Sequence, residues 1–363
     1  MKLKQRQKPK GASGLGQLLI PLVALGILIL FNLFRDPSFF SVGMSVNNSG
    51  NIVLTGNLIS VIDSASELAI IAMGMTLVTA ACGGQDISVG AVGAISGAVL
   101  VKVLQGMGGI TVGTLLVAFV FGCLVTILFK LFNGTLVAVF RIQPMIATLI
   151  LYSCARSIAY WINGDATPQL KSGIISAIGK TIPGIPVPTP IFAVILMGLM
   201  LFLIFRFTSL RLYIQSVGIN EGAARLNGIN PTLIKLISFI LLGVCVSIAS
   251  LIGVCRLGQL NHKTLLVDIE MDAILAVAIG GNNLGGGRFR LSGSILGAYI
   301  IQMLTTTLYA MNVAPVNVKA YKAIVIIIIV VAGSPVVKSA LISFWKRLRA
   351  GPAHDSAQKE GVS

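Results

Sequence analysis

Few residues of this chain have side chains that carry out covalent chemistry. Its 363 residues include two histidines, His262 and His354, and five cysteines. No cysteine belongs to a CxxC pair or to a Cys/His cluster, the arrangements that bind metal. No His, Cys or carboxylate constellation of an enzyme accompanies them. We therefore expect a chain that is not an enzyme, with no catalytic residues, no metal site and no cofactor of its own.

The most distinctive polar residues lie instead in a glycine-rich break between apolar segments. Residues 82–90 read Cys-Gly-Gly-Gln-Asp-Ile-Ser-Val-Gly. Gly83 and Gly84 permit backbone conformations that a helix excludes. The sequence predicts Asp86 as the N-cap of a helix that begins near Ile87, with its carboxylate near the positive end of that helix. Two interpretations remain open: a cap with a packing seam, or a break that lines a pathway.

A second break, at residues 280–288, reads Gly-Gly-Asn-Asn-Leu-Gly-Gly-Gly-Arg. It lacks the Lys-Ser/Thr of a P-loop and follows an apolar helix pattern, not a strand, so it predicts no nucleotide site. Residues 93–98 and 293–298 both fit Gly-x-Ile-x-Gly-Ala and both follow a break. This echo suggests an internal repeat with glycine-interrupted helices, which is common in transporters. The glycines predicted to break helices or pack them closely are Gly83, Gly84, Gly90, Gly93, Gly97, Gly280, Gly281, Gly293 and Gly297.

Composition places these breaks in a membrane. Hydrophobic residues make up 55% of the chain, charged residues 10%, and the mean hydropathy is +0.94. A soluble domain carries roughly 25% charged residues. The net charge of +16 is distributed between apolar runs without a nucleic-acid-binding motif, so we read it as a topology signal and expect no nucleic-acid partner.

The sequence predicts an all-α, polytopic transmembrane bundle of about ten spans. The apolar runs are 17–34, 58–82, 86–104, 110–131, 144–162, 189–205, 236–255, 272–282, 291–311 and 320–337. Residues 132–143 form either a short re-entrant piece or a loop. The basic first ten residues resemble the start of a signal peptide, but the run that follows is long and lacks an Ala-x-Ala site. We therefore predict an uncleaved first span.

The distribution of basic residues predicts that both termini are cytoplasmic. Most Lys and Arg, including Lys130, then fall on the inside, and loops 35–57 and 163–188 fall outside. The predicted domains are a basic N-terminus (1–16), a permease domain (17–345) and a disordered tail (346–363). The loop 206–235 is cytoplasmic, and Glu221 to Leu226 should form a short amphipathic helix that ends at Asn227-Gly228. This helix either docks into a partner's groove or is an ordinary connection.

Together these motifs resemble the permease subunits of bacterial ribose- and galactose-type ABC sugar importers, from about Glu67 to Val337. The resemblance rests on residues 74–78 (GMTLV), 83–90 (GGQDISVG), 133–134 (NG), 144–149 (PMIATL), 220–229 (NEGAARLNGI), 271–274 (MDAI), 280–281 (GG) and 285–287 (GGG). Gln85 departs from the usual Ile of the family's Gly-Gly-Ile-Asp. Asn282 and Asn283 add polar groups to the second break.

The resemblance implies import by alternating access, driven by a separate cytosolic ABC ATPase that binds the ATP and Mg. It also implies an extracytoplasmic sugar-binding protein, a second permease subunit and the bacterial inner membrane. The loop 215–231 would contact the ATPase, where the common pattern is Glu-Ala-Ala-x-x-x-Gly and this chain has Gly in the acidic position. The coupling residues expected there are Gly218, Asn220, Glu221, Gly222, Ala223, Ala224, Arg225 and Gly228.

For the substrate pathway, amide, hydroxyl and adaptable side chains in the central spans are the candidates, with packing or capping as the alternative for each. They are Met75, Gln85, Asp86, Asn133, Gln143, Thr148, Asn282 and Gln302. The substrate alternatives are a nucleoside or a branched-chain amino acid. An ion-coupled transporter would need ionisable residues deep within spans. Those considered, Asp63, Glu67, Lys102, Arg156 and Asp272, are predicted near span ends, which argues against it.

Overall fold

The computed structural model describes residues 14–46 and 52–333. The chain divides into two compact units, Met1–Ala314 and Pro315–Ser363. Most of the predicted basic N-terminus and all of the predicted tail at 346–363 lie outside the described residues. In the second unit the described part is one helix, α13 (Pro315–Gly333).

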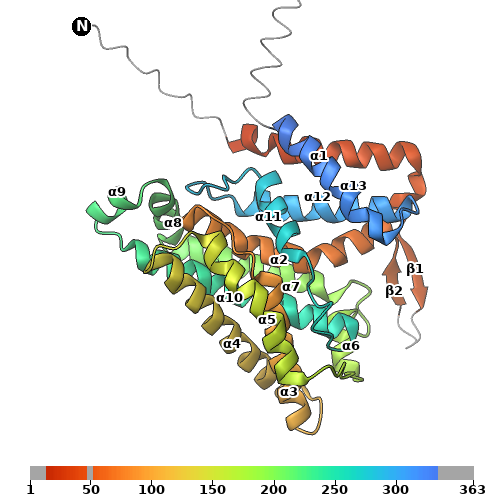
Figure 1. The fold of residues 1–363 in the computed structure, drawn as a ribbon. Coiled ribbons are helices and arrows are strands. Elements are labelled where there is room, and N and C mark those ends of the chain that lie inside the picture. Colours follow the sequence, from red (N-terminus) through yellow and green to blue (C-terminus); the bar gives the residue numbers. More distant parts are fainter. Residues whose placement is uncertain (1–13, 47–51, 334–363) are drawn as a thin grey trace, which may run out of the picture. The chain divides into compact units, whose positions relative to one another are not determined.

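The first unit is almost entirely helical (Figure 1). Its α-helices are α1 (Gly14–Arg35), α2 (Asn57–Cys82), α3 (Val89–Gly106), α4 (Val112–Ala138), α5 (Pro144–Asn163), α6 (Gly173–Gly179), α7 (Thr189–Phe207), α8 (Leu210–Ile219), α9 (Glu221–Leu226), α10 (Pro231–Leu257), α11 (Ile269–Ile279) and α12 (Leu291–Ala310). A 3₁₀ turn, η1 (Pro37–Phe40), precedes a short antiparallel hairpin of β1 (Gly43–Val46) and β2 (Ile52–Thr55).

The predicted all-α membrane fold is confirmed. Seven helices in the described chain, α2, α3, α4, α5, α7, α10 and α12, are long and apolar enough to cross a bilayer. Each of the ten predicted runs overlaps a helix. However, the 11 residues of α11 extend only about 16 Å, too short to span the roughly 30 Å hydrocarbon core. We therefore describe α11 as a half-length helix.

The structure corrects the prediction around residue 130. Helix α4 continues to Ala138, so most of 132–143 is neither a re-entrant piece nor a loop. Lys130, which we predicted on the cytoplasmic side at the end of its run, lies inside α4 and is fully buried. The short helix predicted from Glu221 to Leu226 is confirmed as α9, while α8 within the same loop was not predicted.

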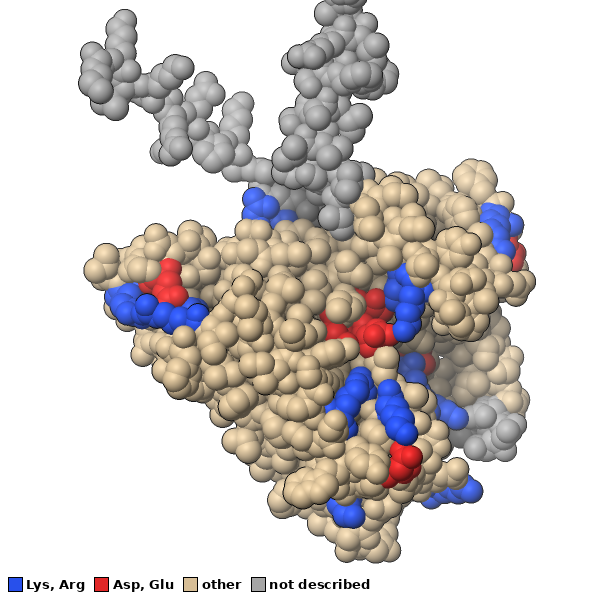
Figure 2. Space-filling model, viewed as in Figure 1, with Lys and Arg blue, Asp and Glu red and all other residues tan. Residues whose placement is uncertain are grey.

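Helices α2, α3 and α10 form the buried centre, and α4, α5 and α7 are more peripheral. Helix α10 packs against α2 and α4, and α3 packs against α4 and α5. In the most apolar segments of α4, α5 and α7 only 22–28% of residues are buried. The face in Figure 2 is accordingly mostly uncharged. Apolar side chains that point outward from these helices are what a lipid-facing surface requires.

The two stretches that share the pattern Gly-x-Ile-x-Gly-Ala each carry a pair of glycines, Gly93 and Gly97 in one and Gly293 and Gly297 in the other. Both pairs permit close packing, but with different partners. A Cβ on Gly293 or Gly297 of α12 would overlap the backbone of Gly280 or Ala276, so α11 and α12 meet backbone to backbone. A Cβ on Gly93 or Gly97 of α3 would instead meet side chains of the segment that precedes α11. Both glycine pairs lie within the first three turns of a helix that follows a break.

We predict that Gly297→Ala destabilises the protein, because the added methyl group overlaps the Ala276 carbonyl. Overpacking of this kind costs about 1–3 kcal/mol. Thermal unfolding of the purified protein in detergent should show a lower midpoint. Gly198→Ala in α7 is the control, because the nearest atom is 3.9 Å from its Cβ position. Equal midpoints for Gly297→Ala and the wild type would contradict the predicted backbone contact.

Candidate transport pathway and coupling site

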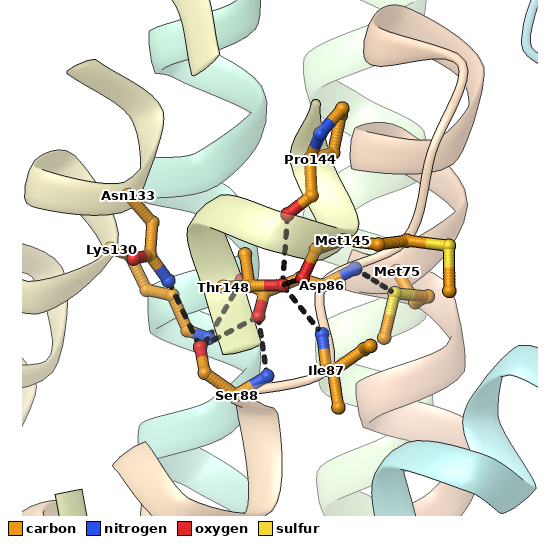
Figure 3. A network of polar contacts seen from close by, with 9 residues as sticks. All are labelled: Met75, Asp86, Ile87, Ser88, Lys130, Asn133, Pro144, Met145 and Thr148. Atoms are coloured by element: carbon orange, nitrogen blue, oxygen red, sulfur yellow. Dashed lines mark hydrogen bonds and ion pairs between the residues drawn. The ribbon is translucent and has the colours of Figure 1, made fainter. Parts of the chain in front are cut away.

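The first glycine break contains a hydrogen-bonded turn centred on Asp86 (Figure 3). Helix α2 ends at Gly83, whose φ of 64° lies in the left-handed region that favours glycine. Asp86 Oδ1 accepts hydrogen bonds from Ser88 N at 2.8 Å and Ser88 Oγ at 2.6 Å. The N-cap position of α3 is Ser88, without a side-chain capping bond, so the prediction of Asp86 as the N-cap was wrong.

Asp86 instead forms an ion pair within the bundle. Lys130 Nζ lies 2.8 Å from Asp86 Oδ2, and both side chains are fully buried. Lys130 Nζ also donates to Ser88 Oγ at 2.9 Å, and Asn133 Nδ2 donates to the same oxygen at 3.0 Å. The pair is therefore hydrogen-bonded as well as charge-compensated, which a buried charge requires.

Two further side chains bond the backbone of this turn. Thr148 Oγ1, on α5, accepts from Ile87 N at 3.1 Å. The sulfur of Met75, on α2, accepts from Asp86 N at 3.4 Å. With Ser88 N bonded to Asp86, three consecutive backbone N–H groups are bonded by side chains. Non-helical backbone at membrane depth needs such partners, because lipid offers none.

The second break contacts the first. Asn282 Oδ1 accepts from Arg290 N at 2.7 Å, and its Nδ2 donates to Ser294 Oγ at 2.8 Å, which bridges the two ends of the break. Gln85 Nε2 of the first break donates to Leu284 O at 3.0 Å. Gly287 N donates to Ala80 O at 3.0 Å. The two breaks therefore form a single junction.

Helix α8 ends against the same junction. A Cβ on Gly218 would overlap Ala80 O and lie 2.7 Å from Gly287 N. A Cβ on Gly286 would lie 3.0 Å from the Cα of Gly83 and 3.2 Å from Gly218 O. We call Gly83, Gly218 and Gly285–Gly287 the glycine junction. The absence of side chains lets three backbone segments meet where a larger residue would separate them.

The segment that follows α8 is exposed and carries both charge and apolar surface. Asn220 caps α9 by accepting from Ala223 N at 3.0 Å. Glu221 pairs with Lys235 at 2.7 Å and with Arg225 at 3.6 Å. The hydrogen bond from Lys235 lowers the pKa of Glu221, which keeps that carboxylate ionised at neutral pH. Figure 2 shows mixed charges at the end of the molecule that carries α9.

Two large apolar side chains of this segment contact little of the described protein. Leu226, at the end of α9, is 92% exposed, and Ile219, at the end of α8, is 74% exposed. Of the other predicted coupling residues, Gly222, Ala223 and Gly228 are exposed and Ala224 is buried. Gly228 has a φ of 78°, which fits the predicted turn after the short helix.

A separate polar cavity of about 310 Å³ lies away from the break network. Glu67 and Ser64 of α2, Arg256 of α10 and Gln302 of α12 are among its lining residues. Arg256 lies 3.2 Å from both Asp63 Oδ1 and Glu67 Oε1, and it donates to Asp63 O at 3.0 Å. Glu67 is the eleventh of the 26 residues of α2, so its ion pair with Arg256 of α10 places an ionisable group well inside a helix and not only at its end.

The structure brings together part of the predicted pathway set. Met75, Asp86, Asn133 and Thr148 share one network, Gln85 joins the second break, and Asn282 stabilises that break. Gln143 is exposed at the N-cap position of α5, and Gln302 lines the separate cavity. Whether any of these residues contacts substrate stays a prediction.

Sequence reasoning missed several functional candidates. Lys130 is the only charged residue of the 27-residue helix α4, and that isolation was an available signal. Arg156 and Arg256 gave no comparable signal, because their partners come from distant segments. Among the five residues that we predicted near span ends, Glu67 lies well inside α2, so the argument against ion coupling does not hold for that residue.

Comparisons with known proteins give consistent matches along the chain. The profile of a family described as the branched-chain amino acid transport system permease component matches residues 57–332. A galactofuranose transporter permease of Escherichia coli (strain K12) is 36% identical over 86% of this chain and 88% of its own length. No solved structure matches.

Two further relatives are sugar permeases by name. A fructose import permease of Bifidobacterium longum (strain NCC 2705) is 32% identical over 93% of this chain and 92% of its own length. A ribose import permease of Escherichia coli (strain K12) is 33% identical, over 85% and 91% respectively.

We predict that Lys130→Met destabilises the protein by roughly 3–5 kcal/mol, because it leaves the Asp86 carboxylate buried without its counter-charge. Adding Asp86→Asn should restore at least half of the lost stability, measured as the thermal midpoint in detergent. Lys102→Met in α3 is the control, because Lys102 is exposed. A double variant less stable than Lys130→Met alone would contradict the proposed role of the ion pair.

Proposed function

This chain belongs to the family of permease components of branched-chain amino acid transport systems, and from that membership we propose that it is the membrane subunit of an ATP-driven monosaccharide importer. The observation that carries the substrate class is the similarity, at 32–36% identity over nearly the whole chain, to galactofuranose, fructose and ribose permeases. The proposed substrate is therefore a monosaccharide, either a pentose or a hexose, including a galactofuranose-like sugar. The family description keeps a branched-chain amino acid as the alternative.

The chain is a transport component and not an enzyme. We propose that ATP and Mg are bound by a separate cytosolic ATPase, and that sugar arrives on an extracytoplasmic binding protein. A second permease subunit, identical or homologous, would complete the membrane part. In the proposed topology both termini and the α8–α9 segment face the cytoplasm of a bacterial cell, and the β1–β2 hairpin faces outward.

The proposed coupling mechanism follows from the contacts of α8 and α9. A partner ATPase would bind the exposed α9, where Leu226 supplies an apolar anchor and the Glu221, Arg225 and Lys235 group supplies charge. Movement of α9 would pass through α8 to Gly218, which touches Ala80 near the end of α2 and Gly287 of the second break. Helices that end or begin at the breaks would then shift between outward- and inward-facing arrangements.

Reconstitution tests the function directly. The permease and its ATPase are reconstituted into proteoliposomes with ATP in the lumen, on the side that α9 faces. When the loaded binding protein is added outside, these proteoliposomes should take up radiolabelled ribose, fructose or galactofuranose. Uptake of leucine but none of the three sugars would establish the amino-acid alternative. Uptake by the permease alone, driven by a proton or sodium gradient, would establish ion coupling instead.

We predict that Leu226→Ala weakens ATPase binding about tenfold, because a central apolar anchor of an interface contributes roughly 1–2 kcal/mol or more. Binding of the purified ATPase to the detergent-solubilised permease measures the effect. Ile185→Ala is the control, because this partly exposed residue adjoins Pro186, which bonds the β1–β2 hairpin. Equal affinities for Leu226→Ala and the wild type would exclude Leu226 as an anchor.

We also predict that Gly218→Ala separates ATP hydrolysis from transport. Its methyl group would overlap Ala80 O and push α8 away from the junction, while α9 remains able to bind the ATPase. Sugar uptake per ATP hydrolysed should fall at least fivefold. Gly113→Ala in α4 is the control, because it lies outside the α8–α9 segment and the nearest atom to its Cβ position is 3.9 Å away. Wild-type uptake by Gly218→Ala would contradict transmission through the junction.

A further inference from the structure

The polar cavity between α2, α10, α11 and α12 has the composition of a site for a neutral monosaccharide. Its volume of about 310 Å³ lies at the lower end of the roughly 300–1,000 Å³ of small-molecule sites. Its lining combines the Glu67 carboxylate, the Arg256 guanidinium and the Gln302 amide. Together these groups offer donors and acceptors of three kinds at one place.

The cavity lies within the helix bundle, where exposed polar groups need an explanation. Its wall includes residues 264–267 of the non-helical segment between α10 and α11. Leu266 of this segment reaches Gly93 of α3, since a Cβ there would lie 2.6 Å from Leu266 Cδ1. Gly93 lies 13 residues before the end of α3 at Gly106, about 20 Å along the helix. Non-helical backbone at such depth occurs where it is buried in protein or lines a water-filled cavity.

The segment is held in place by side chains rather than by secondary structure. Arg156 Nη1 of α5 donates to His262 O at 2.7 Å and to Leu265 O at 3.2 Å. On the opposite wall, Asp63 and Glu67 lie one turn apart on α2 and fix the Arg256 guanidinium between them. Both walls of the cavity are therefore positioned by buried or half-buried arginines.

Some hydrogen-bonding capacity in this cavity is left for a ligand. The Gln302 amide, half-buried, makes no hydrogen bond with another residue of the described chain. Glu67 Oε1 and Arg256 Nε, 3.2 Å apart, are themselves enclosed by protein, but 17% of the Glu67 side chain and 23% of the Arg256 side chain remain exposed. A polar group at membrane depth that lacks a partner is costly unless it faces water or a ligand.

From these contacts we propose that the cavity is a transit site at which the permease itself binds a monosaccharide through Gln302, Glu67 and Arg256. The proposal rests on the sugar-importer function above and extends it, because substrate would be recognised a second time after leaving the binding protein. Sugar hydroxyls both donate and accept, so the carboxylate and guanidinium would bind adjacent hydroxyls and the amide would bind a third.

Site-directed labelling tests the proposal. Gln302→Cys should react with a positively charged methanethiosulfonate reagent, quantified by peptide mass spectrometry in the permease–ATPase complex. Whichever of ribose, fructose and galactofuranose the wild type transports, at 10 mM, should slow this labelling at least threefold, whereas mannitol should not. Thr305→Cys, one turn along α12, is the control, because Thr305 does not line the cavity. Labelling of Gln302→Cys that the transported sugar leaves unchanged would overturn the proposal.

A second variant separates a binding role from a structural one. Gln302→Leu keeps the size of the side chain and removes its amide, so sugar uptake per ATP hydrolysed should fall about tenfold. Equal losses of ATPase activity and uptake would indicate a structural role and overturn the proposal. A wild-type complex that transports none of the three sugars would instead contradict the proposed function, and so the two failures are distinguishable.

Discussion

The structure depends on one constraint, which is that backbone leaving a helix inside a bilayer must find hydrogen-bond partners within the protein. At the first break this is met by side chains of α2, of α5 and of the break itself, because Met75, Thr148 and Asp86 accept from three consecutive N–H groups. The Lys130 ammonium then neutralises the carboxylate that the turn needs. One buried ion pair therefore stabilises a conformation that lipid alone would disfavour.

Because the breaks lack regular secondary structure, they can approach other segments closely. Glycine makes this approach possible, and the junction of Gly83, Gly218 and Gly285–Gly287 joins α2 and the second break to the exposed α8–α9 segment. Because no flexible side chain lies between the contacting backbones, one segment can move little without displacing the other. A displacement at α9 is therefore well placed to reach the interior without a long chain of intermediates.

The two polar regions of the bundle differ in what they leave unsatisfied. Around Asp86 nearly every group is bonded, which suits a rigid structural role, although Asn133 Oδ1 lacks a hydrogen-bond partner in the described chain. Beside the open volume, the Gln302 amide makes no hydrogen bond with another residue of the described chain. Whether the polar atoms already have hydrogen-bond partners, more than polarity itself, distinguishes a packing network from a site that binds a ligand.

The sequence by itself determined the membrane, the all-α class, the approximate helix positions, the two glycine breaks and the short helix α9, because these follow from local composition and from residues near in the chain. It could not determine that Lys130 pairs with Asp86, 44 residues away, or that Arg256 pairs with Asp63 and Glu67. Nor could it show that Gly218 meets Ala80 and Gly287. Those features are decided by which segments pack together, and hydrophobic periodicity carries no information on the partner of a buried charge.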